Sequence, residues 1–172
     1  AWLRGHLVRD PSVKRDACSP RRFTLHATRF TLTPPTTMPP RRVDITPAAE
    51  QMLRRLEALH GPLLFHQSGG CCDGSAPMCY PRGEFRIGAR DVLLGEVAGT
   101  PFWIGDQQYA YWKHTHLTVD VVPGRGSGFS VEAPEGVRFL IRSRLFADDE
   151  WAALEAAGEP PRGAALEAAP AG

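Results

Sequence analysis

One helical segment, followed by a series of short strand-like segments, is the feature that most limits the folds open to this chain. Between Thr46 and Gly61 the apolar residues recur at helical spacing, Thr46 is suited to cap the first turn, and Pro47 suits the first helical position. Gly61 then ends the segment. The buried stripe of this predicted helix consists of Ala49, Met52, Leu53, Leu56 and Leu59.

Apolar segments separated by Gly- and Pro-containing turns follow this helix, as is typical of strands. The predicted strands are 63–66, 91–97, 101–104, 115–122, 129–132 and 137–145. Asp148 is placed to cap a short last helix, in which Trp151 and Leu154 can cover one end of the sheet. The order predicts an α+β fold: a small curved mixed or antiparallel sheet, or a barrel-like β core, with an N-terminal helix and a short C-terminal helix.

The two ends of the chain lack such patterns. Residues 1–41 are rich in Arg, end in Pro-rich sequence and are predicted to be a disordered extension. Because Met38 directly precedes the patterned part, we interpret residues 1–37 as lying upstream of the natural protein; Asp10 and Asp16 disfavour the alternative, an organelle-targeting peptide. A single globular domain is expected at 42–157, with a disordered tail at 158–172.

Charge and hydropathy identify no partner. The formal net charge is +1, which gives no broad basic field for nucleic acid or an anionic membrane. The sequence contains no run of about 18 apolar residues and no apolar signal segment, so we expect a soluble cytoplasmic protein. With 172 residues, of which 42% are hydrophobic, the chain can bury a core without disulfides or metals.

Three of the four cysteines, Cys71, Cys72 and Cys79, crowd into one segment, and Cys18 stands apart. This is not a disulfide scaffold, and in a reducing compartment clustered thiols are typical of metal or redox sites. Glycines at 69, 70 and 74 allow the backbone to approach a bound group closely. The three thiolates are candidate ligands of zinc, copper, iron or an iron–sulfur cluster. Adjacent cysteines fit one tetrahedral ion poorly, so either one of them joins Cys79 or the two form a redox-responsive vicinal disulfide.

Histidines offer nitrogen ligands for the same site. In the predicted strand 115–122 and the residues before it, His114 and His116 share one face with Thr118 and Asp120, and His66 directly precedes the cysteine segment. These three imidazoles are candidate metal ligands. The alternative is a solvated face, or a histidine bonded to an aromatic neighbour.

The segment Gly105–Trp112 contains three aromatic residues next to Asp106. It fits either a pocket wall with a few polar groups or a part of the core.

Three segments, Leu64–Pro81, Gln108–Trp112 and Asp120–Glu132, closely resemble the bacterial family catalogued as domain of unknown function 779, over roughly 42–151. The resemblance implies a gene neighbourhood with aldehyde dehydrogenases. The chain is also similar to A-type iron–sulfur carriers of the HesB and IscA kind. The shared features are Thr46–Ala49, Gly69–Cys71 and Gly128–Pro134. This second resemblance implies that Cys71 is a ligand, but the carriers' two C-terminal cysteines have no counterpart, because no cysteine follows Cys79.

The leading hypothesis is a metal- or cluster-binding accessory factor of an aldehyde- or alcohol-dehydrogenase pathway rather than an enzyme. In it Cys71 and Cys79 ligate, Cys72 contributes or responds to redox state, and His114 or His116 completes the site. Two alternatives stay open. One is a thiol-based redox enzyme or sensor with Cys71 or Cys72 as nucleophile, and the other is a non-catalytic protein that binds a dehydrogenase.

Overall fold

The structure is a computed structural model that describes residues 38–67, 69, 76–126 and 128–164. Its helices are α1 (Pro47–His60), α2 (Asp106–Trp112) and α3 (Asp148–Ala157), and a 3-10 turn spans Ala133–Glu135. Its strands are β1 (Val43–Ile45), β2 (Leu63–Gln67), β3 (Met78–Pro81), β4 (Val92–Val97), β5 (Thr100–Ile104), β6 (Thr115–Pro123) and β7 (Val137–Leu145). The predicted α+β class is confirmed.

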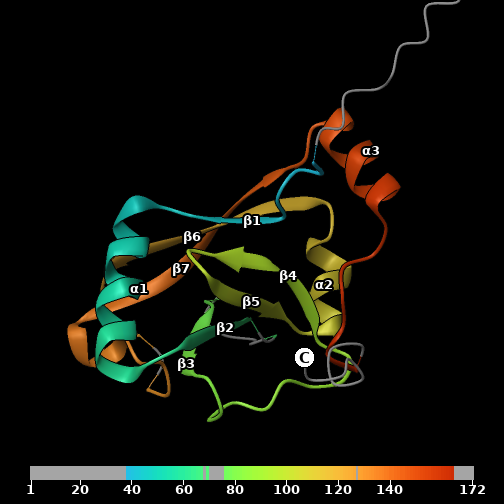
Figure 1. Cartoon of the computed structure of the whole chain (residues 1–172). Coiled ribbons are helices and arrows are strands. Elements are labelled where there is room, and N and C mark those ends of the chain that lie inside the picture. Colours follow the sequence, from blue (N-terminus) through green and yellow to red (C-terminus); the bar gives the residue numbers. More distant parts are fainter. Residues whose placement is uncertain (1–37, 68, 70–75, 127, 165–172) are drawn as a thin grey trace, which may run out of the picture. The chain divides into compact units, whose positions relative to one another are not determined.

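The strands form two mixed sheets, which do not close into a barrel (Figure 1). The three-stranded sheet has the order β1-β6-β7, with β1 parallel and β7 antiparallel to β6. The four-stranded sheet has the order β3-β2-β5-β4, in which only the central β2–β5 pair is parallel. In Figure 1, α1 lies at one end of the two sheets and α2 lies at the other.

Helix α1 begins and ends where the sequence predicts. The Thr46 hydroxyl oxygen accepts the Ala49 N–H at 3.3 Å, Pro47 is the first helical residue, and Gly61 ends the helix with a positive φ of 77°. The cap is also tied to the three-stranded sheet, because the Thr46 hydroxyl donates to Asp120 Oδ1 at 2.8 Å. The helix is therefore fixed at a residue of β6. Ala49, Leu53 and Leu56 of its apolar stripe are buried in the core, whereas Leu59, predicted to be buried with them, is exposed.

The main core lies between the sheets and α1. Phe65 of β2 packs edge to face on Phe139 of β7, with ring centroids 5.0 Å apart, and lies 5.8 Å from Phe102 of β5. The other fully or almost fully buried members of this cluster are Val43, Ala49, Leu53, Leu56, Leu63, Cys79, Val97, Leu117 and Val119. Both sheets and the helix therefore share one apolar interior.

Several local predictions are wrong or incomplete. The sequence pattern does not predict the short strands β1 and β3. Nor does it predict that residues 106–112 form a helix, α2. Tyr109 and Trp112 of α2 pack in a small second cluster with Val92 and Ile104, as the core interpretation of this segment expects. Residues 129–132 are not a strand. They form turns that lead into the 3-10 segment, because the side chains of Ser130 and Glu132 are buried and hydrogen-bonded to each other.

The C-terminal boundary also differs from the prediction. Helix α3 starts at Asp148, but the Glu150 carboxylate caps it by accepting the Ala147 N–H at 2.9 Å. Beyond Gly158 the chain continues in a defined path, and residues 161–164 hydrogen-bond to β4 and the turn before it. Residues 1–37 and 165–172, for which disorder was predicted, lie outside the described residues. None of the helices in the described part has the length and apolar character that a membrane crossing requires.

The packing of α1 predicts the effect of two matched substitutions. Leu53 is fully buried, so Leu53→Ala is expected to lower the free energy of unfolding by about 2–5 kcal/mol through the cavity that it leaves. Leu59 lies on the same helix but is 63% exposed, so Leu59→Ala should change stability by less than about 0.5 kcal/mol. Urea unfolding of both variants checks this, and equal losses would contradict the packing described.

Candidate functional site

A buried histidine–carboxylate pair lies on the four-stranded sheet, on the face of β2 opposite the main core. His66 is only 6% exposed, and its Nε2 lies 3.1 Å from Asp91 Oδ2. Asp91 directly precedes β4, and its Oδ2 also accepts the Gly88 N–H at 2.7 Å, which holds the carboxylate in place. The Phe85 ring packs on the imidazole with centroids 4.5 Å apart and on Tyr80 at 4.6 Å.

The environment of His66 keeps the imidazole neutral and defines which nitrogen is free. Burial lowers the pKa of His66 below its ordinary value, against the opposing charge and hydrogen bond of Asp91. Because a carboxylate accepts hydrogen bonds, Nε2 carries the proton that is donated to Asp91. Nδ1 therefore keeps a lone pair, which can bind a metal or accept a proton.

The next residue, Gln67, is an unusual buried polar group. Its side chain is fully buried, and neither its nitrogen nor its oxygen has a hydrogen-bond partner among the residues that the structure describes. Such groups are rare in protein interiors. The cysteine segment begins just after it: Ser68 and residues 70–75, which include Cys71 and Cys72, lie outside the described residues. The buried polar residues His66 and Gln67 thus precede the predicted thiol ligands Cys71 and Cys72 in the sequence.

Cys79 occupies a different environment from the one predicted. Its side chain is fully buried in the main core, and its strand position pairs with Phe65, whereas His66 pairs with Met78. Neighbouring residues of a strand point to opposite faces, so the Cys79 thiol and the His66 imidazole lie on opposite sides of the sheet. Burial, with smaller contributions from the carboxylates of Glu132 and Glu57, raises the pKa of Cys79 well above its ordinary value. In the folded protein the Cys79 thiol is therefore protonated and inaccessible to solvent.

A buried polar group that the sequence analysis missed lies beside Cys79. The Cys79 N–H donates to Ser130 Oγ at 2.8 Å, and the Ser130 hydroxyl donates to the Glu132 carboxylate. Glu132 is 2% exposed, and burial raises its pKa, although hydrogen bonds from Ser130 and from the backbone N–H groups of Glu132 and Phe139 oppose the shift. These bonds attach the connection between β6 and β7 to β3. The sequence pattern does not indicate this buried Ser130–Glu132 pair, because it predicts a strand at 129–132.

The other two predicted histidines lie apart from this group. His116 of β6 is 9% exposed, and its Nε2 is 3.0 Å from Asp44 Oδ2 of β1. His114 is exposed and packs on the Trp151 ring at 4.4 Å, which matches the aromatic alternative. Within the described ranges, no three His, Cys, Asp or Glu side chains are grouped so that they could hold a metal ion. The structure therefore does not bring together Cys79, His66, His114 and His116.

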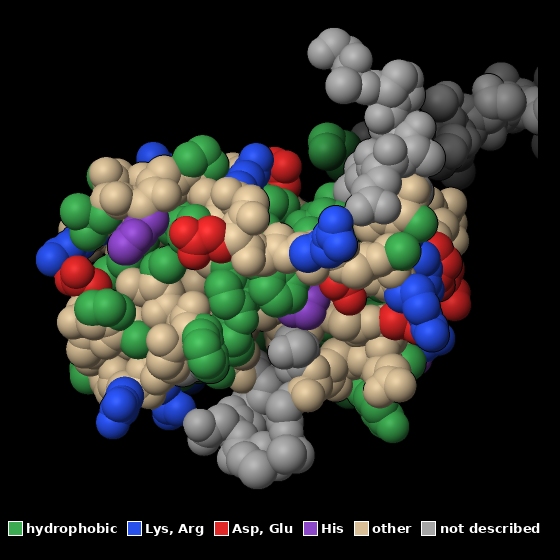
Figure 2. Space-filling view, turned by 90° about the horizontal axis from the view of Figure 1, so that it is seen from below, with side chains coloured by type: hydrophobic (Ala, Val, Ile, Leu, Met, Phe, Trp, Pro, Cys, Tyr) green, Lys and Arg blue, Asp and Glu red, His purple; other side chains and the backbone are tan. Residues whose placement is uncertain are grey.

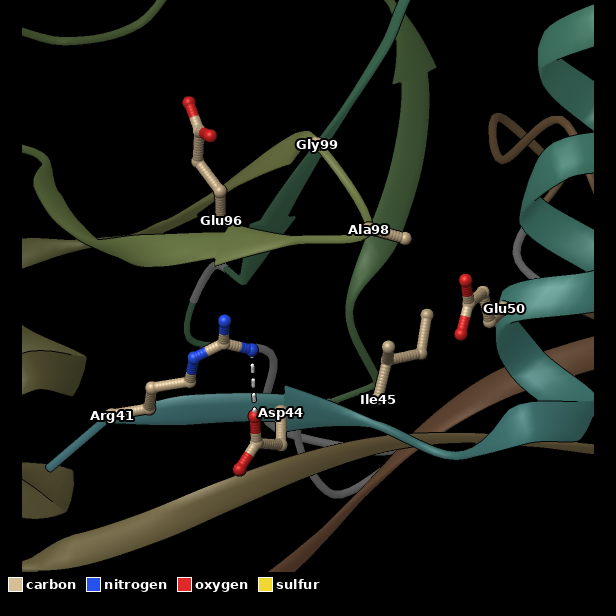
Figure 3. Close-up of a pocket in the computed structure, with 7 residues that line it drawn as sticks. All are labelled: Arg41, Asp44, Ile45, Glu50, Glu96, Ala98 and Gly99. Carbon is tan, nitrogen blue, oxygen red and sulfur yellow. Dashed lines mark hydrogen bonds and ion pairs between the residues drawn. The ribbon is translucent and has the colours of Figure 1, made fainter.

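A cavity of about 610 Å³ lies elsewhere, between β1, α1 and the turn that joins β4 to β5 (Figure 3). On its β1 side the Arg41 guanidinium and the Asp44 carboxylate form an ion pair at 3.3 Å. Its lining residues are Arg41, Asp44, Ile45, Glu50, Glu96, Ala98 and Gly99. Among these described residues there is neither a thiol nor an imidazole.

The surface view shows one apolar area of the described part. In Figure 2, hydrophobic side chains gather in the middle of the face seen from below.

Comparison with known proteins identifies a family. The model of the family described as Domain of unknown function (DUF779) matches residues 52–145. This match covers more than half of the 172 residues, so the chain belongs to that family. A search of curated proteins gave no significant match. These comparisons do not show the resemblance to iron–sulfur carriers of the HesB and IscA kind.

The burial of Cys79 predicts its reactivity. When the folded protein is treated with iodoacetamide at neutral pH, Cys79 is expected to remain unmodified, because its thiol is protonated and inaccessible to the reagent. Peptide mass spectrometry checks this, with protein unfolded in urea as the control in which Cys79 reacts. Equal alkylation rates in the two conditions would contradict the buried position.

The buried Glu132 predicts a pH dependence of stability. As the pH rises above about 4.5, the unfolded carboxyl ionises while the folded one stays protonated, so the folded state binds more protons. The contribution of Glu132 to stability is therefore full below this pH and declines as the pH rises through the raised folded pKa. Glu132→Gln should remove this decline, and Glu84→Gln, at an exposed position, should keep it. Urea unfolding between pH 4 and pH 8 measures the slopes; the same slope in all three proteins would refute the assignment.

Proposed function

We propose that this member of the DUF779 family is a cytoplasmic metal-binding accessory factor whose site combines the thiolate of Cys71 or Cys72 with Nδ1 of His66. The observation that carries the proposal is the buried His66–Asp91 pair, five residues before Cys71 in the sequence. A metal-binding histidine commonly donates its other N–H to a carboxylate, which fixes the ring and makes the free nitrogen a better donor. His66 has this arrangement.

The ligand types suggest which metals to test. Thiolate and neutral imidazole ligands favour zinc, copper(I) or iron over magnesium and calcium, which prefer oxygen ligands. The lowered pKa of His66 helps, because an imidazole must be unprotonated at the binding nitrogen before it can ligate.

The proposal changes the ligand set that the sequence suggested. Cys79 is left out because its thiol is protonated in the core. His116 is left out because it lies on β6 of the three-stranded sheet, whereas His66 lies on β2 of the four-stranded sheet. His114 is left out because it precedes β6 and its exposed ring packs on Trp151. Cys71 and Cys72 remain as the candidate thiol ligands, and one of them supplies the thiolate.

A second candidate function uses the same pair differently. A neutral imidazole held by a carboxylate is also the arrangement of a general base that activates a nucleophile. In this alternative His66 accepts the proton of Cys71 or Cys72, and the protein is a thiol-based redox enzyme or sensor. In either case an aldehyde dehydrogenase is the proposed partner, on the ground of the gene neighbourhood that the family resemblance implies.

Metal retention tests the leading proposal. Protein purified under anaerobic, reducing conditions is expected to hold about one zinc, copper or iron ion per chain, measured by elemental mass spectrometry. His66→Ala and the double change Cys71→Ser, Cys72→Ser should lose the metal. Asp91→Asn should weaken zinc binding by about 10–100-fold, because the carboxamide holds the imidazole less well.

Matched controls separate the two candidate functions. His114→Ala and Cys18→Ser should retain the metal, because neither residue belongs to the proposed site. Metal-free protein that contains one rapidly alkylated thiol, slowed by His66→Ala, would favour the thiol function. Metal-free protein with uniformly slow thiols would refute both.

A further inference from the structure

The C-terminal segment after α3 folds back onto the four-stranded sheet. We call residues 161–164 the C-terminal strap. The Leu93 N–H donates to the Pro161 carbonyl at 2.8 Å, and the Gly163 N–H donates to the Asp91 carbonyl at 2.9 Å. The Ala164 N–H donates to the Ala89 carbonyl at 3.0 Å. In Figure 1 this part of the chain runs from α3 past α2 to the start of β4.

A charged side chain fastens the strap. Arg162 Nη1 donates to Asp106 Oδ1 at 2.5 Å and to the Arg90 carbonyl at 3.2 Å. Arg90 also binds the Asp106 carboxylate. Hydrogen bonds from Arg162 and Arg90 lower the pKa of Asp106, so this carboxylate stays ionised and keeps both partners. The strap is thereby joined to the first residue of α2 and to the segment before β4.

The strap contacts the turn that holds the partner of His66. Gly163 is buried, and a side chain at this position would overlap the Gly88 carbonyl. The Gly88 carbonyl accepts the Asp91 N–H at 3.0 Å, and the Gly88 N–H donates to the Asp91 carboxylate. The 88–91 turn therefore lies between the strap on one side and His66 on the other.

We propose that the C-terminal strap is a positioning element for the site: Arg162 and Gly163 fix the 88–91 turn, the turn fixes the Asp91 carboxylate, and Asp91 orients His66. Asp91 is bonded by the strap through its carbonyl and by His66 through its side chain. The importance of the strap for activity rests on the proposed function, in which His66 serves the cysteine segment.

The strap could instead only stabilise the fold, so the test needs a signal that stability alone would not change. The experiment uses the full-length chain, metal-free and reduced, as wild type, Gly163→Val and Arg162→Ala. Ala164→Ser is the matched control, because residue 164 has an exposed side chain and joins the sheet only through its backbone. Urea unfolding at the same temperature establishes that each variant is folded.

Two NMR signals are followed. Hydrogen exchange of the Leu93 amide reports whether the strap is bound, and the imidazole nitrogen shifts of His66 report which tautomer is present. In Gly163→Val and Arg162→Ala, Leu93 exchange is expected to rise at least about tenfold, since its acceptor is released. In the same variants the His66 ring should change from one tautomer to an average of two, and Ala164→Ser should match wild type.

Either of two results overturns the proposal: faster Leu93 exchange with an unchanged His66 ring signal, or unchanged Leu93 exchange in both variants. Because the protein is metal-free, the result does not depend on whether the wild type binds a metal. Failure of the strap and failure of the metal site are therefore separate observations.

Discussion

Strand β2 is buried on both faces, and the arrangement of the site depends on this constraint. All five of its residues are buried. One face supplies Phe65 to the core between the sheets, and the other holds His66 against Phe85 and Asp91. A one-residue shift of this strand would exchange the phenyl and imidazole rings, placing an imidazole in the core. The packing of Phe65 in the core therefore also fixes His66 on the opposite face of β2, beside Asp91.

The sequence predicts those elements whose signal is local. Helix α1 is marked by Thr46, Pro47 and Gly61, and the long strand β7 has the predicted limits. Strands β1 and β3 are missed because they have three and four residues, too few to show a period. Helix α2 is missed because its seven residues have no side-chain cap, and its aromatic residues suggested another role. In each case the missing information comes from tertiary packing.

The same limit applies to the site. His66 was identified from its place before the cysteines, but its partner Asp91 is 25 residues away and is brought there by strand pairing that no local pattern encodes. Cys79 was grouped with the other cysteines by proximity in sequence, whereas the alternation of β3 turns its thiol into the core. The buried Ser130–Glu132 bond is missed because the sequence pattern predicts a strand at 129–132, whereas these residues form turns that lead into the 3-10 segment.

The hydrogen bond between Thr46 and Asp120 has a consequence for folding during synthesis. The two residues are 74 positions apart, and the parallel pairing of β1 with β6 spans a similar distance. When α1 leaves the ribosome, the strand that anchors its first turn has not yet been made. The three-stranded sheet can therefore form only after most of the chain has emerged, and closing so long a loop slows folding. Until then, the apolar stripe of α1 lacks the part of the core that β6 and β7 supply.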